Sequence, residues 1–230
     1  MACSATDAWS LVVVLSWGMG EREDYYDRRA AEYDETVTDG LDAETAAAFA
    51  RELAALGRVL KALPPGRVLD VACGTGLFAQ YLRGSVVALD RSERMLKIAR
   101  TRIPAAQLVR AGVPALPFGD ATFDRLFTSH FYGHLVQTEG MAFLAEARRV
   151  APELVVVDTA AYEGVRPDGW QERVLRDGSR YTIYKRHFTA EGLLAELGGD
   201  GEVLFARRFF VAAVAPAIPS GNSGWRREEP

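Results

Sequence analysis

The stretch VLDVACGTGLF, residues 68–78, decides the fold of this chain of 230 residues. A short apolar run there leads into a turn that contains Gly74 and Gly76. Glycine allows the backbone to turn sharply, and it lets a ligand approach without meeting a Cβ atom. In a doubly wound sheet, nucleotide-type cofactors bind at such turns, outside the carboxyl ends of the strands. Taken alone, the stretch predicts either a cofactor site or a tight strand–helix turn without a ligand.

Strand-like and helical segments alternate around this stretch, a pattern typical of βαβ units and a parallel, doubly wound sheet. The run LVVV at residues 154–157 is apolar throughout, which suits a strand covered on both faces. We expect strands at residues 67–71, 85–89, 107–110, 124–129 and 154–158 and helices at residues 43–63, 77–83, 93–101 and 140–150. The alternation predicts an α/β fold with a mostly parallel, seven-stranded sheet.

Two segments depart from this alternation. Tyr25, Arg29 and Tyr33 are spaced four residues apart and share one helical face, which predicts an N-terminal helical cap. The dipeptide Asp177-Gly178 favours a tight turn, and it predicts a β-hairpin inserted after the fifth strand. The segments expected beyond residue 158 are strands at 170–175, 181–188, 202–205 and 209–215, the last an antiparallel edge strand, and a helix from Thr189 to Leu197.

The domain boundaries follow from composition. We expect one domain at residues 21–216, because no interdomain linker or repeat interrupts it. Residues 1–20 are expected to be a disordered or extraneous extension, whose apolar run 11–15 is too short to span a bilayer. Residues 217–230 are rich in Pro, Gly, Ser and charge, and they are expected to form a flexible tail.

The charge and cysteine content narrow the class of protein. The chain has 27 Lys and Arg against 31 Asp and Glu, and an acidic chain without a basic tail is a poor candidate for binding nucleic acid. Cys3 and Cys73 form no disulfide framework, which favours a reducing cytoplasm. No His, Cys and carboxylate group has metal-ligand spacing, so no metal is expected. We expect a cytoplasmic monomer or homodimer with no nucleic-acid or membrane partner.

Asp90 follows the second predicted strand, where a carboxylate can accept hydrogen bonds from a ribose diol. Its alternative role is to cap the helix from about residue 93, which Ser92 is equally suited to do. Gly74-x-Gly76-x-x-Ala79 also matches the dinucleotide fingerprint. From these residues alone, both a dinucleotide and S-adenosylmethionine fit the site.

The stretch DVACGTG, residues 70–76, resembles motif I of the class I S-adenosylmethionine-dependent methyltransferases. The resemblance implies a Rossmann-like methyltransferase fold, S-adenosylmethionine as cofactor, and methyl transfer to a small-molecule acceptor in secondary or specialised metabolism. It covers roughly residues 21–215. The other segments similar to family motifs are DRSERML at 90–96, ALPF at 115–118, Phe123-Asp124, and the N-terminal segment 28–34 that many members fold over the cofactor.

The resemblance also implies which residues bind the cofactor. The methionine moiety would be held by Asp70, by the backbone of Ala72, Gly74 and Gly76, and by the carbonyl of Ser129. The ribose would bind Asp90, and the adenine would be bordered by Arg91, Met95, Gly112 and Val113. Tyr26 and Tyr33 would form a lid, or would belong to a helix that merely docks on the core. Two departures from the family stand out: Ala72 replaces the first glycine of motif I, and Gly112 stands where many members have Asp.

His130 and His134 follow the fourth strand directly, at the expected reaction face. A hydroxyl acceptor would gain from a histidine base, so both are candidate catalytic residues, and a limb of the pH–rate profile is expected near about pH 6–7. Their alternative role is structural, as loop histidines bonded to backbone or packed on aromatic rings. His187 is a weaker candidate.

The inserted hairpin is expected to overhang the substrate pocket or to be an ordinary solvated hairpin. In the first case its aromatic residues would form apolar walls, and Arg173, Lys185 or Arg186 would pair with an acidic group. The aromatic residues in question are Trp170, Tyr181, Tyr184 and Phe188. Two alternatives to a methyltransferase remain at this point: a non-catalytic S-adenosylmethionine-binding protein and an NAD-dependent oxidoreductase.

Overall fold

A seven-stranded sheet lies at the centre of the computed structural model, which describes residues 24–216. The expectations for residues 1–20 and 217–230 lie outside these described residues. The strand order is β3-β2-β1-β4-β5-β9-β8. The strands are β1 (Gly66–Val71), β2 (Gly84–Asp90), β3 (Gln107–Arg110), β4 (Arg125–Ser129), β5 (Glu153–Thr159), β8 (Glu202–Ala206) and β9 (Phe210–Pro216).

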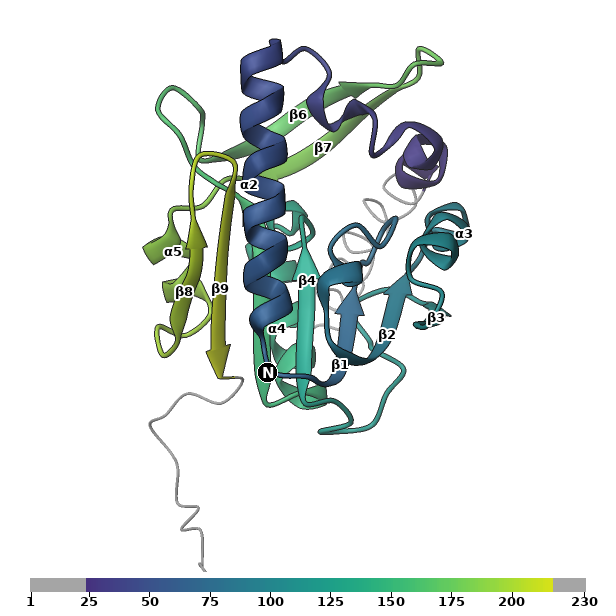
Figure 1. Cartoon of the computed structure of the whole chain (residues 1–230), viewed down its shortest axis with the longest axis vertical. Helices are drawn as coiled ribbons and strands as arrows, with labels where there is room; N and C mark the ends of the chain where they lie inside the picture. The colour runs from purple at the N-terminus through teal and green to yellow at the C-terminus, as the bar shows by residue number, and fades with distance from the viewer. Residues whose placement is uncertain (1–23, 217–230) are drawn as a thin grey trace, which may run out of the picture.

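The sheet is mostly parallel, as expected. Strands β1 to β5 pair in parallel, and the order reverses between β1 and β4, which is the switch point where α/β sheets bind ligands. In Figure 1 strands β1, β2 and β4 point upward, so their carboxyl ends lie toward the top of the view.

The last strand, β9, is antiparallel but is not at the edge, so that part of the expectation is wrong. It pairs with β5 on one side and with β8 on the other. The reason is burial: β9 is apolar and buried along most of its length, whereas the shorter β8 is largely half-buried or exposed. The more polar strand is the one that tolerates an open edge.

Helices cover both faces of the sheet. On one face lie α2 (Ala43–Ala62), seen in front of the sheet in Figure 1, and α3 (Glu93–Arg102). On the other face lie α4 (Gln137–Val150) and the short α5 (Ala190–Glu196). Helix α2 begins where the side chain of Asp42 accepts a hydrogen bond from the amide of Thr45 at 2.8 Å. Within residues 24–216, no helix has both the length and the apolar character needed to cross a membrane.

The helix expected at residues 77–83 does not form. Only a single 3-10 turn, η3 (Ala79–Tyr81), is present there. The Tyr81 ring lies so close to Gly57 of α2 that a Cβ atom at Gly57 would be 2.7 Å from it. Helix α2 therefore occupies the layer that a helix after β1 would take, and the connection to β2 is reduced to a turn.

Two elements lie beyond the carboxyl ends of the strands and overhang them in Figure 1. One is the N-terminal segment, with a helical turn at residues 24–29 followed by η1 (Ala30–Glu32) and η2 (Thr36–Thr38). The other is the hairpin of β6 (Asp168–Val174) and β7 (Arg180–Arg186), which forms a separate two-stranded sheet. The two are joined by a small apolar cluster of Tyr25, Leu175 and Ile183. The expected N-terminal cap and inserted hairpin are both present.

Candidate active site

A first cavity of about 170 Å³ opens at the carboxyl ends of β1, β2 and β4. It brings together most of the residues that the sequence assigned to the cofactor. Those lining it are Tyr26, Tyr33, Ala72, Gly74, Asp90, Arg91, Met95, Gly112, Val113 and Ser129. Asp70 and Gly76 do not line the cavity. Several apolar residues of its wall were not predicted, because they come from the loop after β4 and from α4; these include Phe131, Leu135 and Phe143.

The glycine turn after β1 alternates through left-handed backbone conformations. Gly74 has a φ of +53°, and a Cβ atom there would point into open space on the cavity side. Gly76 has a φ of +76°, and a Cβ atom there would be 3.2 Å from Ile103, so this glycine serves packing. Ala72 has a φ of 57°, which costs a residue with a side chain about 1–2 kcal/mol. The position where the family has glycine is therefore strained in this chain, directly at the cavity wall.

Asp90 fixes this turn from the end of β2. Its carboxylate accepts hydrogen bonds from the amides of Gly74 and Ser92, both at 2.8 Å. The cap of α3 is Ser92, whose hydroxyl accepts from the amide of Met95 at 3.1 Å. Asp90 is therefore not the helix cap, and it lines the cavity. Burial raises the pKa of Asp90, while the two amide hydrogen bonds act in the opposite direction.

Asp70 lies behind the turn and is 1% exposed. Its Oδ1 atom has no hydrogen-bond partner among the described residues. Burial, and secondarily the nearby charge of Asp90, raise the pKa of Asp70 well above its ordinary value. A cationic ligand group that reached this carboxylate would satisfy it, although Asp70 itself does not line the cavity.

The turn after β1 disfavours a dinucleotide. Dinucleotide sites place the pyrophosphate at a helix N-terminus, but residues 77–83 form only the η3 turn.

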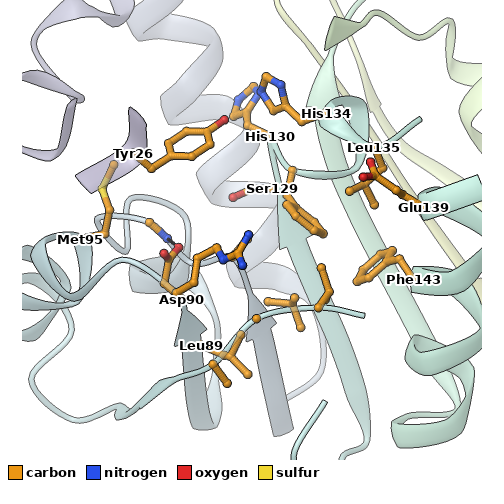
Figure 2. Close-up of a pocket in the computed structure, with 18 of the residues that line it drawn as sticks. Tyr26, Leu89, Asp90, Met95, Ser129, His130, His134, Leu135, Glu139 and Phe143 are labelled. Carbon is orange, nitrogen blue, oxygen red and sulfur yellow. Dashed lines mark hydrogen bonds between the residues drawn. The ribbon is translucent and has the colours of Figure 1, made fainter. Parts of the chain in front are cut away.

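A second cavity of about 530 Å³ lies between α2, β9, the hairpin and the N-terminal segment. Residues common to the linings of both cavities mark the place where the two meet. They are Tyr33, Ala72, Gly74, Ser129, His130 and His134. Both candidate catalytic histidines therefore lie at the junction, and Figure 2 shows Tyr26 pointing toward them from the N-terminal segment.

His130 is held tightly at this junction. Its backbone has a φ of 51°, and its ring packs beside Phe78 and Phe210. The Nδ1 atom lies 3.3 Å from Oγ1 of Thr159 and 4.0 Å from Oδ1 of Asp158. Burial lowers the pKa of His130 to about 4, although the charge of Asp158 acts in the opposite direction. The ring is therefore neutral at pH 7.

His134 has a defined tautomer. Its Nδ1 atom lies 2.7 Å from the carbonyl oxygen of Tyr184, and because a carbonyl only accepts, Nδ1 carries the proton. The lone pair is then on Nε2. Burial lowers the pKa of His134 to about 3, and the charge of Lys185 acts in the same direction. A neutral imidazole with an acceptor nitrogen thus lies at the junction of the two cavities.

An ion pair that the sequence analysis missed supports this junction. Lys185 donates to Oδ1 of Asp158 at 2.7 Å, and both side chains are buried. The other oxygen of Asp158 accepts from the amide of Gly133 at 2.7 Å, in the loop between the histidines. Asp158 thereby ties the hairpin and the histidine loop to β5. Its position at the end of an apolar strand, like that of Asp90, was the available signal.

The hairpin does border the second cavity, but the expected aromatic walls are wrong, because none of Trp170, Tyr181, Tyr184 and Phe188 lines either cavity. Side chains alternate across a strand, and Trp170 and Tyr184 form a pair on the outer face, where Trp170 is 60% exposed. The inner face carries Arg173 and Lys185, which do line the second cavity. Its aromatic walls instead come from Phe49, Phe78, Phe209 and Phe210.

Of the remaining candidates, Arg186 pairs with Glu196 at 3.0 Å, and neither it nor His187 lines either cavity. Within residues 24–216, no three His, Cys, Asp or Glu side chains are grouped so that they could hold a metal ion.

Comparison with known proteins agrees with this geometry. Residues 69–153 match the family model described as a methyltransferase domain. The malonyl-[acyl-carrier protein] O-methyltransferase of Pseudescherichia vulneris is 34% identical over 138 residues, which are 57% of this chain and 52% of that protein. The demethylmenaquinone methyltransferase of Renibacterium salmoninarum is 40% identical over 92 residues, 39% of this chain and 38% of that protein. The chain thus spans about half, or less, of the length of these curated relatives.

Solved structures match over most of the chain. DhpI in complex with SAH superposes with a TM-score of 0.65 at 26% identity, covering 86% of this chain and 96% of DhpI. DhpI in complex with SAM and HEP gives the same TM-score at 25% identity. Together with the glycine turn, the two strand-end carboxylates and the sheet order, these likenesses support assignment of the chain to the class I S-adenosylmethionine-dependent methyltransferases.

Proposed function

We propose that this chain transfers the methyl group of S-adenosylmethionine to a small-molecule acceptor, with residues 21–216 as the catalytic domain. The observation that carries the proposal is the meeting of two cavities at His130 and His134. The first cavity has the residues that suit the cofactor, and the second is large enough to receive an acceptor. A methyl group held at the junction would therefore be exposed to an acceptor in the second cavity.

The cofactor supplies a methyl group already activated by its positive sulfonium. The chain's task is to hold and orient it. Asp70, whose Oδ1 lacks a partner among the described residues, would accept from the methionine ammonium together with the carbonyl of Ser129. Asp90 would accept from the ribose hydroxyls, and the space beside Gly74 lets the ligand approach the turn. Arg91, Met95, Gly112 and Val113 would border the adenine.

His134 is the better placed of the two candidate bases. The bond from its Nδ1–H to the carbonyl of Tyr184 leaves Nε2 to take the proton of an acceptor hydroxyl. His130 would support the same step from across the junction. Tyr26 and Tyr33 would close the first cavity; burial raises the pKa of Tyr33 to about 12, so its hydroxyl keeps its proton.

The size of the second cavity and the net charge of −4 favour a small molecule over a nucleic acid. We place the reaction in secondary or specialised metabolism, and the chain in a reducing cytoplasm as a monomer or homodimer. The alternative is a protein that binds S-adenosylmethionine without transferring its methyl group.

The test is calorimetry with S-adenosylmethionine, its demethylated product and NAD, followed by transfer of a labelled methyl group into a metabolite library. We expect both sulfur compounds to bind, NAD not to bind, and label to enter a small molecule. Binding without transfer to any acceptor would favour the non-catalytic alternative. Failure of both sulfur compounds to bind would overturn the proposal.

A further inference from the structure

The second cavity has more positive than negative charge on its walls. The cationic side chains that line it are Arg29, Arg173, Arg176 and Lys185, and the carboxylate side chains that line it are Glu32 and Asp39. Which of these charges are compensated by neighbours decides what the cavity can bind.

Arg176 and Lys185 are compensated. Arg176 lies 2.8 Å from a carboxylate oxygen of Glu35, 3.6 Å from one of Asp39 and 3.7 Å from one of Glu32. Lys185 is paired with Asp158 behind the cavity wall. Arg176 therefore accounts for both carboxylates that line the cavity, and Lys185 is compensated by Asp158, which does not line it.

Arg29 and Arg173 have only neutral partners. Arg29 donates to the hydroxyl of Tyr25 at 2.7 Å and to Oγ1 of Thr36 at 3.3 Å, and it lies over the ring of Tyr33. Arg173 donates to Oε1 of Gln171 at 2.6 Å, and both arginines are half-buried. Neither guanidinium makes an ion pair with a carboxylate among residues 24–216. The hydrogen bonds hold the two groups in place while their charge remains uncompensated, as in a preformed anion site.

The opposite wall of the cavity is apolar. Phe209 and Phe210 of the turn into β9 meet Phe49 of α2 in edge-on or tilted ring contacts. Phe78 of the glycine turn joins Phe210 at a ring distance of 6.0 Å. The cavity therefore combines a cationic side, on the N-terminal segment and hairpin, with an aromatic side on the sheet and α2.

We propose that the methyl acceptor is an amphipathic acid, a carboxylate or a phosphate ester, whose anionic group binds Arg29 and Arg173 while its apolar body lies against the phenylalanines. A guanidinium offers a planar fork of donors that matches either oxyanion. This inference rests on the proposed function, because it assigns the second cavity to the acceptor.

The experiment uses three probes with one apolar ring each: phenylacetate, phenyl phosphate and the uncharged phenylacetamide. Binding of each to the full chain is measured by titration, with and without SAH. The test variant is Arg173→Gln, and the matched control is Arg180→Gln on the outer face of the same hairpin, where Arg180 pairs with Glu172 at 2.6 Å. Binding of S-adenosylmethionine to both variants is measured in the same samples.

We expect at least one acid to bind and the amide not to bind. The acid that binds more tightly distinguishes a carboxylate acceptor from a phosphate ester. Arg173→Gln should weaken acid binding at least about tenfold, whereas Arg180→Gln and the affinity for S-adenosylmethionine should stay within about twofold. Arg29→Gln should reproduce the loss.

Equal binding of acids and amide, or equal effects of the two hairpin variants, would overturn the inference. If S-adenosylmethionine still bound to the unaltered chain, the proposed function would not be affected by that result. Absence of S-adenosylmethionine binding to the unaltered chain would count against the proposed function instead. Acid binding that vanished in Arg173→Gln would still support the anion site in that case, because the titration without SAH is independent of the cofactor.

Discussion

The two cavities that meet at the histidines are built in different ways. The wall of the first comes mainly from strand ends and the turns that directly follow them, in one half of the sheet. The wall of the second is assembled from the N-terminal segment, α2, the hairpin and β9, which are far apart in the chain. The cofactor side is thus encoded by short local motifs, whereas the acceptor side depends on how distant elements pack.

The interactions on the two sides differ in kind as well. On the cofactor side, backbone amides of Gly74 and Ser92 donate to the carboxylate of Asp90, so the local backbone fixes the position of this carboxylate. On the acceptor side, side-chain pairs such as Lys185 with Asp158 hold the hairpin in place. We expect substitutions on the first side to change cofactor affinity, and substitutions on the second to change stability or acceptor use.

The largest effect is expected at the junction itself. Asn at position 134 can keep a donor near the carbonyl of Tyr184 but has no imidazole Nε2 lone pair. With a hydroxyl acceptor, His134→Asn should therefore lower kcat by about 10²–10⁴-fold with little change in cofactor affinity. The control is His187→Asn, since His187 lines neither cavity. Equal turnover of the two variants on a hydroxyl acceptor would show that His134 is a structural residue and not the base.

The pH–rate profile sharpens this test, and the structure moves its expected position. The pKa of His134 is lowered to about 3 and that of His130 to about 4, mainly by burial. The base form is therefore populated at all pH values above these, and the acid limb expected near pH 6–7 should be missing. If turnover decreased as the pH fell below about 6.5, the ordinary pKa of histidine, the imidazole that acts as base would be protonated more readily than its burial implies.

Much of the fold was predictable because the apolar periodicity is strong. All five parallel strands around the switch point appear within two residues of their expected bounds. The errors arise where distant packing decides. The segment expected as a helix at residues 77–83 packs closely on Gly57 of α2 through Tyr81 as a single 3-10 turn, and the place of β9 inside the sheet depends on its burial relative to β8.

The candidate site shows the same difference between residues that a local motif predicts and residues whose position depends on distant packing. The glycine turn and Asp90 were predictable because a motif gives both the residues and their place at the strand ends. The pairing of Asp158 with Lys185 was not predictable, because it depends on which face of the hairpin is turned inward. A one-residue change of register would have placed Trp170 and Tyr184 in the cavity instead of Arg173 and Lys185.

The next largest effect concerns that buried pair on the acceptor side. Lys185→Met leaves the Asp158 carboxylate buried without its counter-ion, which should lower the free energy of unfolding by about 3–5 kcal/mol in urea denaturation. The matched control is Lys97→Met, because Lys97 pairs with Glu93 at 3.0 Å on an exposed surface and should change stability by less than about 0.5 kcal/mol. The double variant D158N/K185M removes both charges and should recover part of the loss.

The pH dependence of this variant has a defined sign. Burial alone would raise the pKa of Asp158, but chiefly the charge of Lys185 holds it at about 2, below its ordinary 3.8; His130 acts in the same direction only where it is protonated, below its own pKa of about 4. Its contribution to stability is therefore present above about pH 4 and is lost as the pH falls toward 2. Without Lys185, burial prevails and the carboxyl takes up a proton more readily. The stability gap between the two proteins should be widest near pH 7 and narrow toward pH 4; a constant gap would mean that Lys185 acts through packing alone.

A smaller effect, confined to the cofactor side, is expected from Asp90→Ala. It removes charge-assisted hydrogen bonds worth about 1.5–3 kcal/mol each, so the Kd for S-adenosylmethionine should rise at least about tenfold while the fold persists. Calorimetry and thermal melting measure the two properties. Asp120→Ala is the matched control, because that side chain is 81% exposed and pairs with Arg149 on the surface. If acid-probe binding fell as much as cofactor binding, the separation of the two cavities would be wrong.

The smallest effect tests the N-terminal segment, which borders both cavities. Beside the glycine turn, Asp34 accepts from Oγ1 of Thr75 at 2.8 Å and pairs with Arg102 at 2.6 Å. Arg102 also donates to the carbonyl of Thr75 at 3.0 Å, so part of this contact survives in Asp34→Asn. We expect a loss of about 0.5–1.5 kcal/mol in cofactor binding, a factor of about two to ten in Kd. On the acceptor side, Glu35→Gln breaks an ion pair with Arg176 and should leave the Kd for S-adenosylmethionine unchanged. Equal losses from the two variants would mean that the segment responds as one unit, and that the cofactor and acceptor sides are coupled through it.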